Sequence, residues 1–251
     1  MTQLAFVLLP LLLGLLAFYT RKGVREYAAF KDFTDTGDRQ GTYRTWFLQS
    51  LLLFGLGSLV SLALTGQLAL LARPLPVFTD AVGGWLPDVA SVDLAGFLTG
   101  VTCSALFGGV LLGVVSKRRK TEKPTVIIGD VQALLPRNAA ERRWAAALAL
   151  NAGVSEELFF RLLLPVLIYS VFGHALFALI ASALIFGLVH VYQGWAGVLV
   201  TTLLGAMLMG VYLATGSIWL VMGLHALIDL NGLVVQPLVQ RWVAGTRVAR
   251  A

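Results

Sequence analysis

Four apolar stretches near the end of the chain decide the fold: AAALALNAGVSEELFFRLLLPVLIY (residues 145–169), ALFALIASALIFGLVHV (175–191), AGVLVTTLLGAMLMGVYLA (196–214) and SIWLVMGLHALIDLNGLV (217–234). Each is about as long as a membrane-spanning helix, which needs about 20 largely apolar residues. The linkers between them are only a few residues long and contain Gly173, Gly194 and Gly216. Such short linkers force consecutive spans to lie antiparallel beside one another. These stretches therefore predict a tightly packed helical bundle.

Three further apolar stretches, at residues 4–19, 46–72 and 94–116, bring the predicted number of spans to seven. The composition agrees with an all-α polytopic membrane protein, because 58% of the residues are hydrophobic and only 13% are charged, whereas soluble domains are about a quarter charged. We divide the chain into an N-terminal transmembrane region (1–144) and a C-terminal transmembrane core (145–251). The lone Cys103 lies in an apolar stretch and excludes both an intrachain disulfide and a multi-cysteine zinc site.

The basic residues predict the orientation in the membrane. Segments 20–45 and 117–144 hold six and eight Lys and Arg residues, whereas segment 73–93 holds one. The positive-inside rule places the first two segments in the cytoplasm, the N-terminus outside and the C-terminus inside. We expect the plasma membrane of a prokaryote, with a short interfacial segment at 125–135. The net charge of +6 then reflects contacts with membrane lipids and no binding of nucleic acid.

Six ionisable side chains lie inside the last four predicted spans. They are Glu156, Glu157, Arg161, His190, His225 and Asp229. A charge at the centre of a span costs about 2.5–3.5 kcal/mol on insertion scales, so such a group usually marks a functional site. Helical spacing makes Glu157 and Arg161 neighbours on one face, which predicts a buried ion pair. Glu156 then remains free to face the two histidines and act as a base toward water.

Three motifs in this order resemble those of the CPBP (CAAX protease and bacteriocin-processing, or Abi) family of intramembrane proteases. The motifs are EExxxR at 156–161, FxxxH at 186–190 and HxxxD at 225–229, and the resemblance covers about residues 153–229. It implies an α-helical membrane fold and cleavage of membrane-associated peptide or protein substrates. Residues 1–144 carry no such resemblance.

The resemblance also implies roles for the individual residues. Glu156 would activate the water, His190 would assist it, and His225 with Asp229 would bind the oxyanion or a metal. Glu157, Arg161 and Phe186 would support them. Family members often have Asn where this chain has Asp229, and an ionised carboxylate cannot donate a hydrogen bond to an oxyanion. Asp229 is equally suited to orienting His225.

Metal dependence stays open at this point. Glu156, His190 and His225 are plausible zinc ligands, but they come from three separate spans and nothing resembles HExxH on one helix. A carboxylate and a histidine can also position the water without a metal. Two other functions compete with proteolysis: an inactive relative that serves as an immunity or scaffold protein, and a proton-coupled transporter with buried relay groups. The transporter is disfavoured because the sequence shows no inverted repeat.

Overall fold

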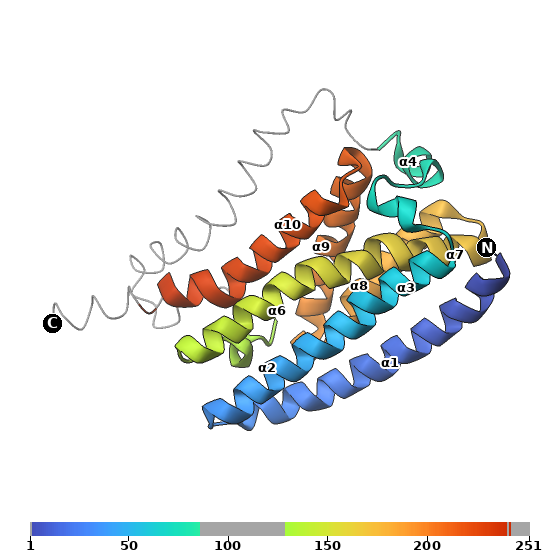
Figure 1. Ribbon diagram of the computed structural model, residues 1–251. Helices are drawn as coiled ribbons and strands as arrows, with labels where there is room; N and C mark the ends of the chain where they lie inside the picture. Colours follow the sequence, from blue (N-terminus) through green and yellow to red (C-terminus); the bar gives the residue numbers. More distant parts are fainter. Residues whose placement is uncertain (1, 86–128, 240, 242–251) are drawn as a thin grey trace.

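The computed structural model describes residues 2–85, 129–239 and 241, and every regular element in this part is helical (Figure 1). The elements of the N-terminal part are α1 (Thr2–Asp32), α2 (Thr36–Ser50), η1 (Leu51–Leu56), α3 (Gly57–Leu64), η2 (Leu68–Leu71) and α4 (Pro76–Val82). Those of the C-terminal part are η4 (Gln132–Leu134), α6 (Ala139–Glu157), η5 (Leu158–Leu163), α7 (Leu164–Phe172), α8 (Ala175–Val189), η6 (Val191–Gln193), α9 (Gly194–Thr215), α10 (Ile218–Leu230) and η7 (Asn231–Val235).

Four helices in the described part are long and apolar enough to cross a membrane: Gln3–Asp32, Thr36–Leu64, Val191–Thr215 and Ile218–Val239. A shorter apolar helix, Ala175–Val189, lies beside them. The chain is thus an all-α, multi-pass integral membrane protein. Seven spans are not established by this structure, because the predicted span at 94–116 lies outside the described residues, as do the first four residues of the predicted interfacial segment at 125–135. That segment ends in the short helix η4.

The predicted loop at 20–45 is wrong. Helix α1 continues to Asp32, α2 begins at Thr36, and Asp35 caps α2 by accepting hydrogen bonds from two backbone amides. The hydropathy pattern marks only the part of a helix that lies in lipid, whereas these helices extend further because Tyr27, Phe30 and Tyr43 are buried against each other. The second predicted span also ends early, at Leu64, where Gly66 adopts a positive φ of 69°.

Helix α6 occupies the middle of the bundle, with α10 on one side and α2 on the other (Figure 1). Its buried side is built from Ala145, Ala149, Gly153 and Glu157, which recur every four residues and therefore share one face. At Gly153 the two backbones nearly touch, because an added Cβ would lie 2.6 Å from the backbone nitrogen of Ala226 in α10. A glycine here lets α6 and α10 approach closely enough for their polar side chains to meet.

Two π-helical segments interrupt otherwise continuous helices. Segment η1 separates α2 from α3, and η5 separates α6 from α7 directly after Glu157. All six residues of η5 are buried, and the rings of Phe54 in η1 and Phe159 in η5 are 5.2 Å apart. Gly153 and Ser155 are residues typical of a loosened or capped helix, yet α6 is continuous there. The irregularity follows the two glutamates instead, and π-helical turns are frequent near functional sites.

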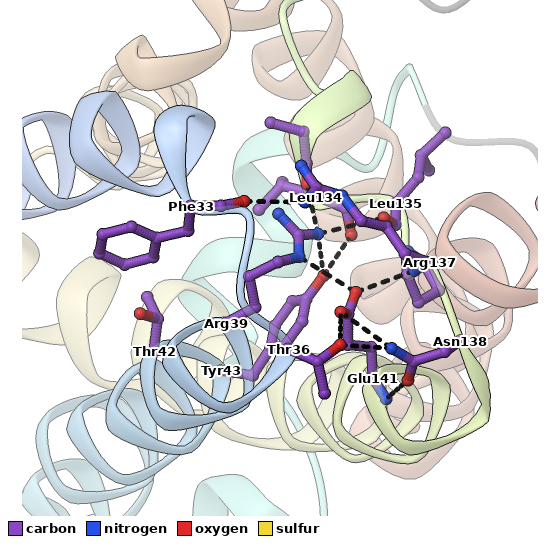
Figure 2. Close-up of polar contacts among 12 residues, drawn as sticks. Phe33, Thr36, Arg39, Thr42, Tyr43, Leu134, Leu135, Arg137, Asn138 and Glu141 are labelled. Atoms are coloured by element: carbon purple, nitrogen blue, oxygen red, sulfur yellow. Dashed lines mark hydrogen bonds and ion pairs between the residues drawn. The ribbon is translucent and has the colours of Figure 1, made fainter.

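A buried polar network joins α2 to the start of α6 (Figure 2). Arg39 and Glu141 are both fully buried and form an ion pair of 3.1 Å. Glu141 also accepts hydrogen bonds from the Thr36 hydroxyl (2.7 Å) and the Arg137 amide (2.8 Å). Burial opposes ionisation of Glu141, but these hydrogen bonds and Arg39 outweigh it, so the pKa of Glu141 lies below its ordinary value of 4.5.

The same network fixes the chain segment that precedes α6. Arg39 donates to the carbonyl oxygen of Ala133 (2.9 Å), and the Tyr43 hydroxyl donates to that of Leu134 (2.8 Å). Asn138 caps α6 by accepting a hydrogen bond from the Glu141 amide (3.0 Å). The helical hairpin formed by α1 and α2 is therefore tied to the helix that carries the glutamate pair.

Candidate active site

Glu157 lies at the centre of the polar cluster and contacts two cations or potential cations. Its Oε2 is 2.9 Å from Arg161 Nε, and both side chains are buried, as the four-residue spacing predicts. Its Oε1 is 2.6 Å from Nδ1 of His225. This second contact was not predicted, because sequence spacing does not show which spans lie side by side. Glu157 therefore connects α6 to α10 through His225, and to the following π-helical turn η5 through Arg161.

Glu156 points away from that pair and lines a cavity. Its Oε2 is 4.0 Å from Nε2 of His190, and this oxygen is buried without a hydrogen-bond partner among the described residues. Nδ1 of His190 is 2.7 Å from the carbonyl oxygen of Phe186. A carbonyl oxygen can only accept, so Nδ1 carries a proton, and in the neutral ring Nε2 is then an acceptor. Glu156 and His190 thus turn two proton-accepting atoms toward each other.

Phe186 contacts three of the six ionisable residues of the cluster. Its ring lies 4.9 Å from that of His190 and 5.9 Å from that of His225, and the Arg161 guanidinium lies 4.5 Å from its centre. Gly205 in α9 gives the ring room, because a Cβ there would be 2.7 Å from Phe186 Cδ1. The side chain therefore holds α8, α9 and the π-helical turn in register around the site.

Asp229 follows His225 by one helical turn, and its Oδ2 is 3.7 Å from Nε2 of that histidine. This separation exceeds a hydrogen bond. His225 consequently lies between two carboxylates, Glu157 on one nitrogen and Asp229 on the other. Glu157 is within hydrogen-bond distance of Nδ1, whereas Asp229 faces Nε2 without forming a hydrogen bond.

The cavity has a volume of about 390 Å³, within the size range of small-ligand pockets. Glu156, His190, His225 and Asp229 all line it. The opposite wall comes from the N-terminal region: Tyr19, Glu26 and Tyr27 of α1, and Trp46, Gln49 and Ser50 of α2. Residues from the N-terminal region (1–144) and from the C-terminal core (145–251) therefore line the same cavity. The C-terminal core does not form the whole cavity wall.

Residues 139–231 match the sequence profile of the family described as type II CAAX prenyl endopeptidase, Rce1-like. This segment is similar to that protease family. The resemblance inferred from the three motifs is thereby confirmed, and all six ionisable residues of the cluster lie within the matched segment. The chain matches no curated protein and no solved structure. The wall contributed by α1 and α2 lies outside the match to the Rce1-like family.

The proposed zinc ligands do not gather as a metal site requires. Within residues 2–85 and 129–239, no three His, Cys, Asp or Glu side chains are arranged to hold a metal ion. His190 faces Glu156, whereas His225 is held between Glu157 and Asp229. The set Glu156, His190 and His225 therefore does not fit a metal in this arrangement, and we derive no chemical step through one.

The sequence did not predict several residues that line the cavity or belong to the polar network that supports it. Residues such as Tyr192, Gln193 and Trp195 are typical of membrane-interface anchors. Trp195 is 75% exposed, but Tyr192 and Gln193 line the cavity. Asn138 and Glu141, three residues apart, form a helix start that the spacing alone could have indicated. No signal in the sequence could have placed Tyr19 or Gln49, because their contribution depends on how α1 and α2 pack against α6.

Proposed function

We propose that this chain is an intramembrane endopeptidase in which Glu156 activates a water molecule and His190 assists it. The observation that carries the proposal is the pair of acceptor atoms, Glu156 Oε2 and His190 Nε2, that face each other at 4.0 Å on the cavity wall. A water molecule has two protons to donate, and it can donate one to each atom when the two are about this far apart. The water's lone pairs then point away from both acceptors, toward the cavity.

The chemistry follows from this arrangement. The water oxygen forms a bond to the carbonyl carbon of the substrate, one water proton moves to Glu156, and the electron pair of the C=O double bond moves to the oxygen. When the tetrahedral intermediate collapses, the C–N bond breaks and Glu156 returns the proton to the leaving amine. His190 Nε2 orients the water through its other proton, and the Phe186 carbonyl fixes the tautomer that makes this possible.

The remaining members of the cluster position this pair. Glu157 holds α6 to α10 through His225, and Arg161 compensates the buried charge of Glu157. Asp229 and Glu157 together fix the ring of His225 beside Phe186. The substrate we propose is a membrane-associated peptide or protein, because the cavity is built within apolar helices and its lining is largely apolar and aromatic.

The test is cleavage by the purified protein in lipid vesicles. Wild type, Glu156→Gln and His190→Ala would each be incubated with a panel of membrane-associated peptides, with and without a strong chelator, and the products mapped by mass spectrometry. We expect wild type to cleave at defined bonds with the chelator present, and both variants to lose this activity. Cleavage that requires added zinc would contradict the metal-free scheme, and equal cleavage by all three proteins would contradict the assignment of Glu156 and His190.

A further inference from the structure

Tyr192 lies on the cavity wall close to His190. It lies in η6, the single 3-10 turn that joins α8 to α9, two residues after His190. Its ring is 6.0 Å from the His190 ring and inclined to it by 35°. Both side chains line the cavity. A peptide group bound in the cavity beside His190 can therefore also reach Tyr192.

The Tyr192 hydroxyl is oriented by Gln193. The side-chain amide of Gln193 donates a hydrogen bond to this hydroxyl oxygen at 3.0 Å, which leaves the phenolic O–H to donate elsewhere. Gln193 itself is held by close backbone approach, since a Cβ on Gly197 would lie 2.4 Å from Gln193 Cβ. Its carbonyl oxygen accepts a hydrogen bond from the Asp130 amide at 2.8 Å. The contacts of this turn therefore fix the position of the Tyr192 hydroxyl.

The N-terminal region supports the same ring from the other side. Tyr27 of α1 meets the Tyr192 ring edge-to-face at 5.2 Å, and the Tyr27 hydroxyl donates to the carbonyl oxygen of Asp130 at 2.6 Å. Lys31 forms an ion pair with the Asp130 carboxylate. Contacts from α1, from the 129–131 segment and from η6 therefore hold Tyr192 in one position.

Most other donors on the described cavity wall are already used. The Thr20 and Thr201 hydroxyls donate to backbone carbonyls of their own helices, and the Trp46 indole donates to Glu26. Ionised Glu156 and Asp229 only accept, His190 turns its Nε2 acceptor to the cavity, and Nε2 of His225 faces the Asp229 carboxylate. Peptide hydrolysis needs a donor where negative charge develops on the carbonyl oxygen. Tyr192 is the available hydroxyl whose ring lies beside His190.

We propose that the Tyr192 hydroxyl donates a hydrogen bond to the carbonyl oxygen of the scissile peptide bond and stabilises the oxyanion that forms when water adds. Tyr192 keeps its proton throughout, and the proton from the water still moves to Glu156. This inference rests on the proposed endopeptidase function. It supplies a donor that Asp229, as a carboxylate, does not.

The test compares Tyr192→Phe with wild type in vesicles, because the substitution removes the hydroxyl and keeps the ring contact with Tyr27. We expect kcat to fall about 10²-fold with KM within a factor of about three. Affinity for a phosphinate peptide, which resembles the tetrahedral intermediate, should fall by a similar factor, and affinity for the corresponding product peptide should not. A purely structural role would not separate these two affinities.

Two further variants make the result decisive. Tyr212→Phe is the matched control, because that buried hydroxyl bonds to the Leu70 carbonyl at 2.9 Å, away from the cavity; its kcat should stay at the wild-type value. Tyr19→Phe removes another cavity hydroxyl. Unchanged kcat and phosphinate affinity in Tyr192→Phe would overturn the proposal, and a loss confined to Tyr19→Phe would move the role to Tyr19. Absence of cleavage by wild type, or full activity of Glu156→Gln, would instead refute the proposed function on which this inference rests.

Discussion

Replacing Gly153 with Ala should separate the two helices that bring the polar cluster together. The added Cβ would lie 2.6 Å from the backbone nitrogen of Ala226, 2.8 Å from its Cα and 2.7 Å from its Cβ. Two of these atoms belong to the backbone and cannot move aside as a side chain can. An ordinary contact begins at 3.4 Å, so α6 and α10 must move apart by about 0.8 Å.

The consequence falls on Glu157 and His225, whose contact across the same two helices is 2.6 Å. The same displacement lengthens it to about 3.4 Å, beyond the range of a good hydrogen bond. Overpacking of this kind destabilises by about 1–3 kcal/mol, and a misplacement of about 1 Å can lower a catalytic rate about 10²-fold. We therefore expect Gly153→Ala to lower both the melting temperature in detergent and kcat.

The assay needs a control glycine on one of these two helices that tolerates a methyl group. A Cβ on Gly223 of α10 would meet nothing within 4 Å, so Gly223→Ala should leave both kcat and the melting temperature near the wild-type values or raise the latter slightly. Combining Gly153→Ala with Ala226→Gly should restore only part of the loss, because the backbone atoms of residue 226 remain. A Gly153→Ala protein as stable and active as Gly223→Ala would refute this account of the helix contact.

Two other substitutions test the buried charges. Arg161→Met should destabilise the protein by about 3–5 kcal/mol, because it leaves Glu157 buried without its guanidinium partner. Adding Glu157→Gln to the same chain should recover much of this loss. Unfolding in detergent measures both effects, and a loss under about 1 kcal/mol in Arg161→Met alone would contradict the expectation. Glu141→Gln should lower the melting temperature at neutral pH. Because the folded pKa of Glu141 lies below its ordinary value of 4.5, the ionised form stabilises the fold above that pH, and this advantage disappears as the pH falls through the folded pKa. The difference between wild type and variant should shrink accordingly on acidification, whereas a constant difference would count against the Arg39–Glu141 pair.

The sequence predicted one contact of the polar cluster better than it predicted the boundaries of the helices. Intramembrane charges are rare, so Glu156, Glu157 and Arg161 stood out, and four-residue spacing was enough to predict the Glu157–Arg161 pair. The contact between Glu157 and His225 could not be predicted, because it depends on the close approach of α6 and α10 at Gly153. Hydropathy also gave no sign that α1 continues to Asp32, since that extension is stabilised by packing outside the apolar stretch.

The part of the cavity built by α1 and α2 was missed for a related reason. Tyr27 and Trp46 look like ordinary aromatic residues near the end of a span, where such side chains commonly lie at the membrane interface. Their role depends on the network around Arg39 and Glu141, which fixes the hairpin against α6. Contacts between residues about 100 positions apart leave no local pattern in one sequence.

The most direct test of the central claim is the turnover of Glu156→Gln in lipid vesicles, measured beside its melting temperature. The substitution keeps the shape of the side chain and removes its capacity to accept a proton. It also replaces a carboxylate, one oxygen of which is buried without a hydrogen-bond partner, with an uncharged amide. We predict that kcat falls about 10²–10⁴-fold while the melting temperature stays the same or rises. Turnover within a factor of about three of wild type by an equally stable variant would contradict the assignment of Glu156 as the base that activates water.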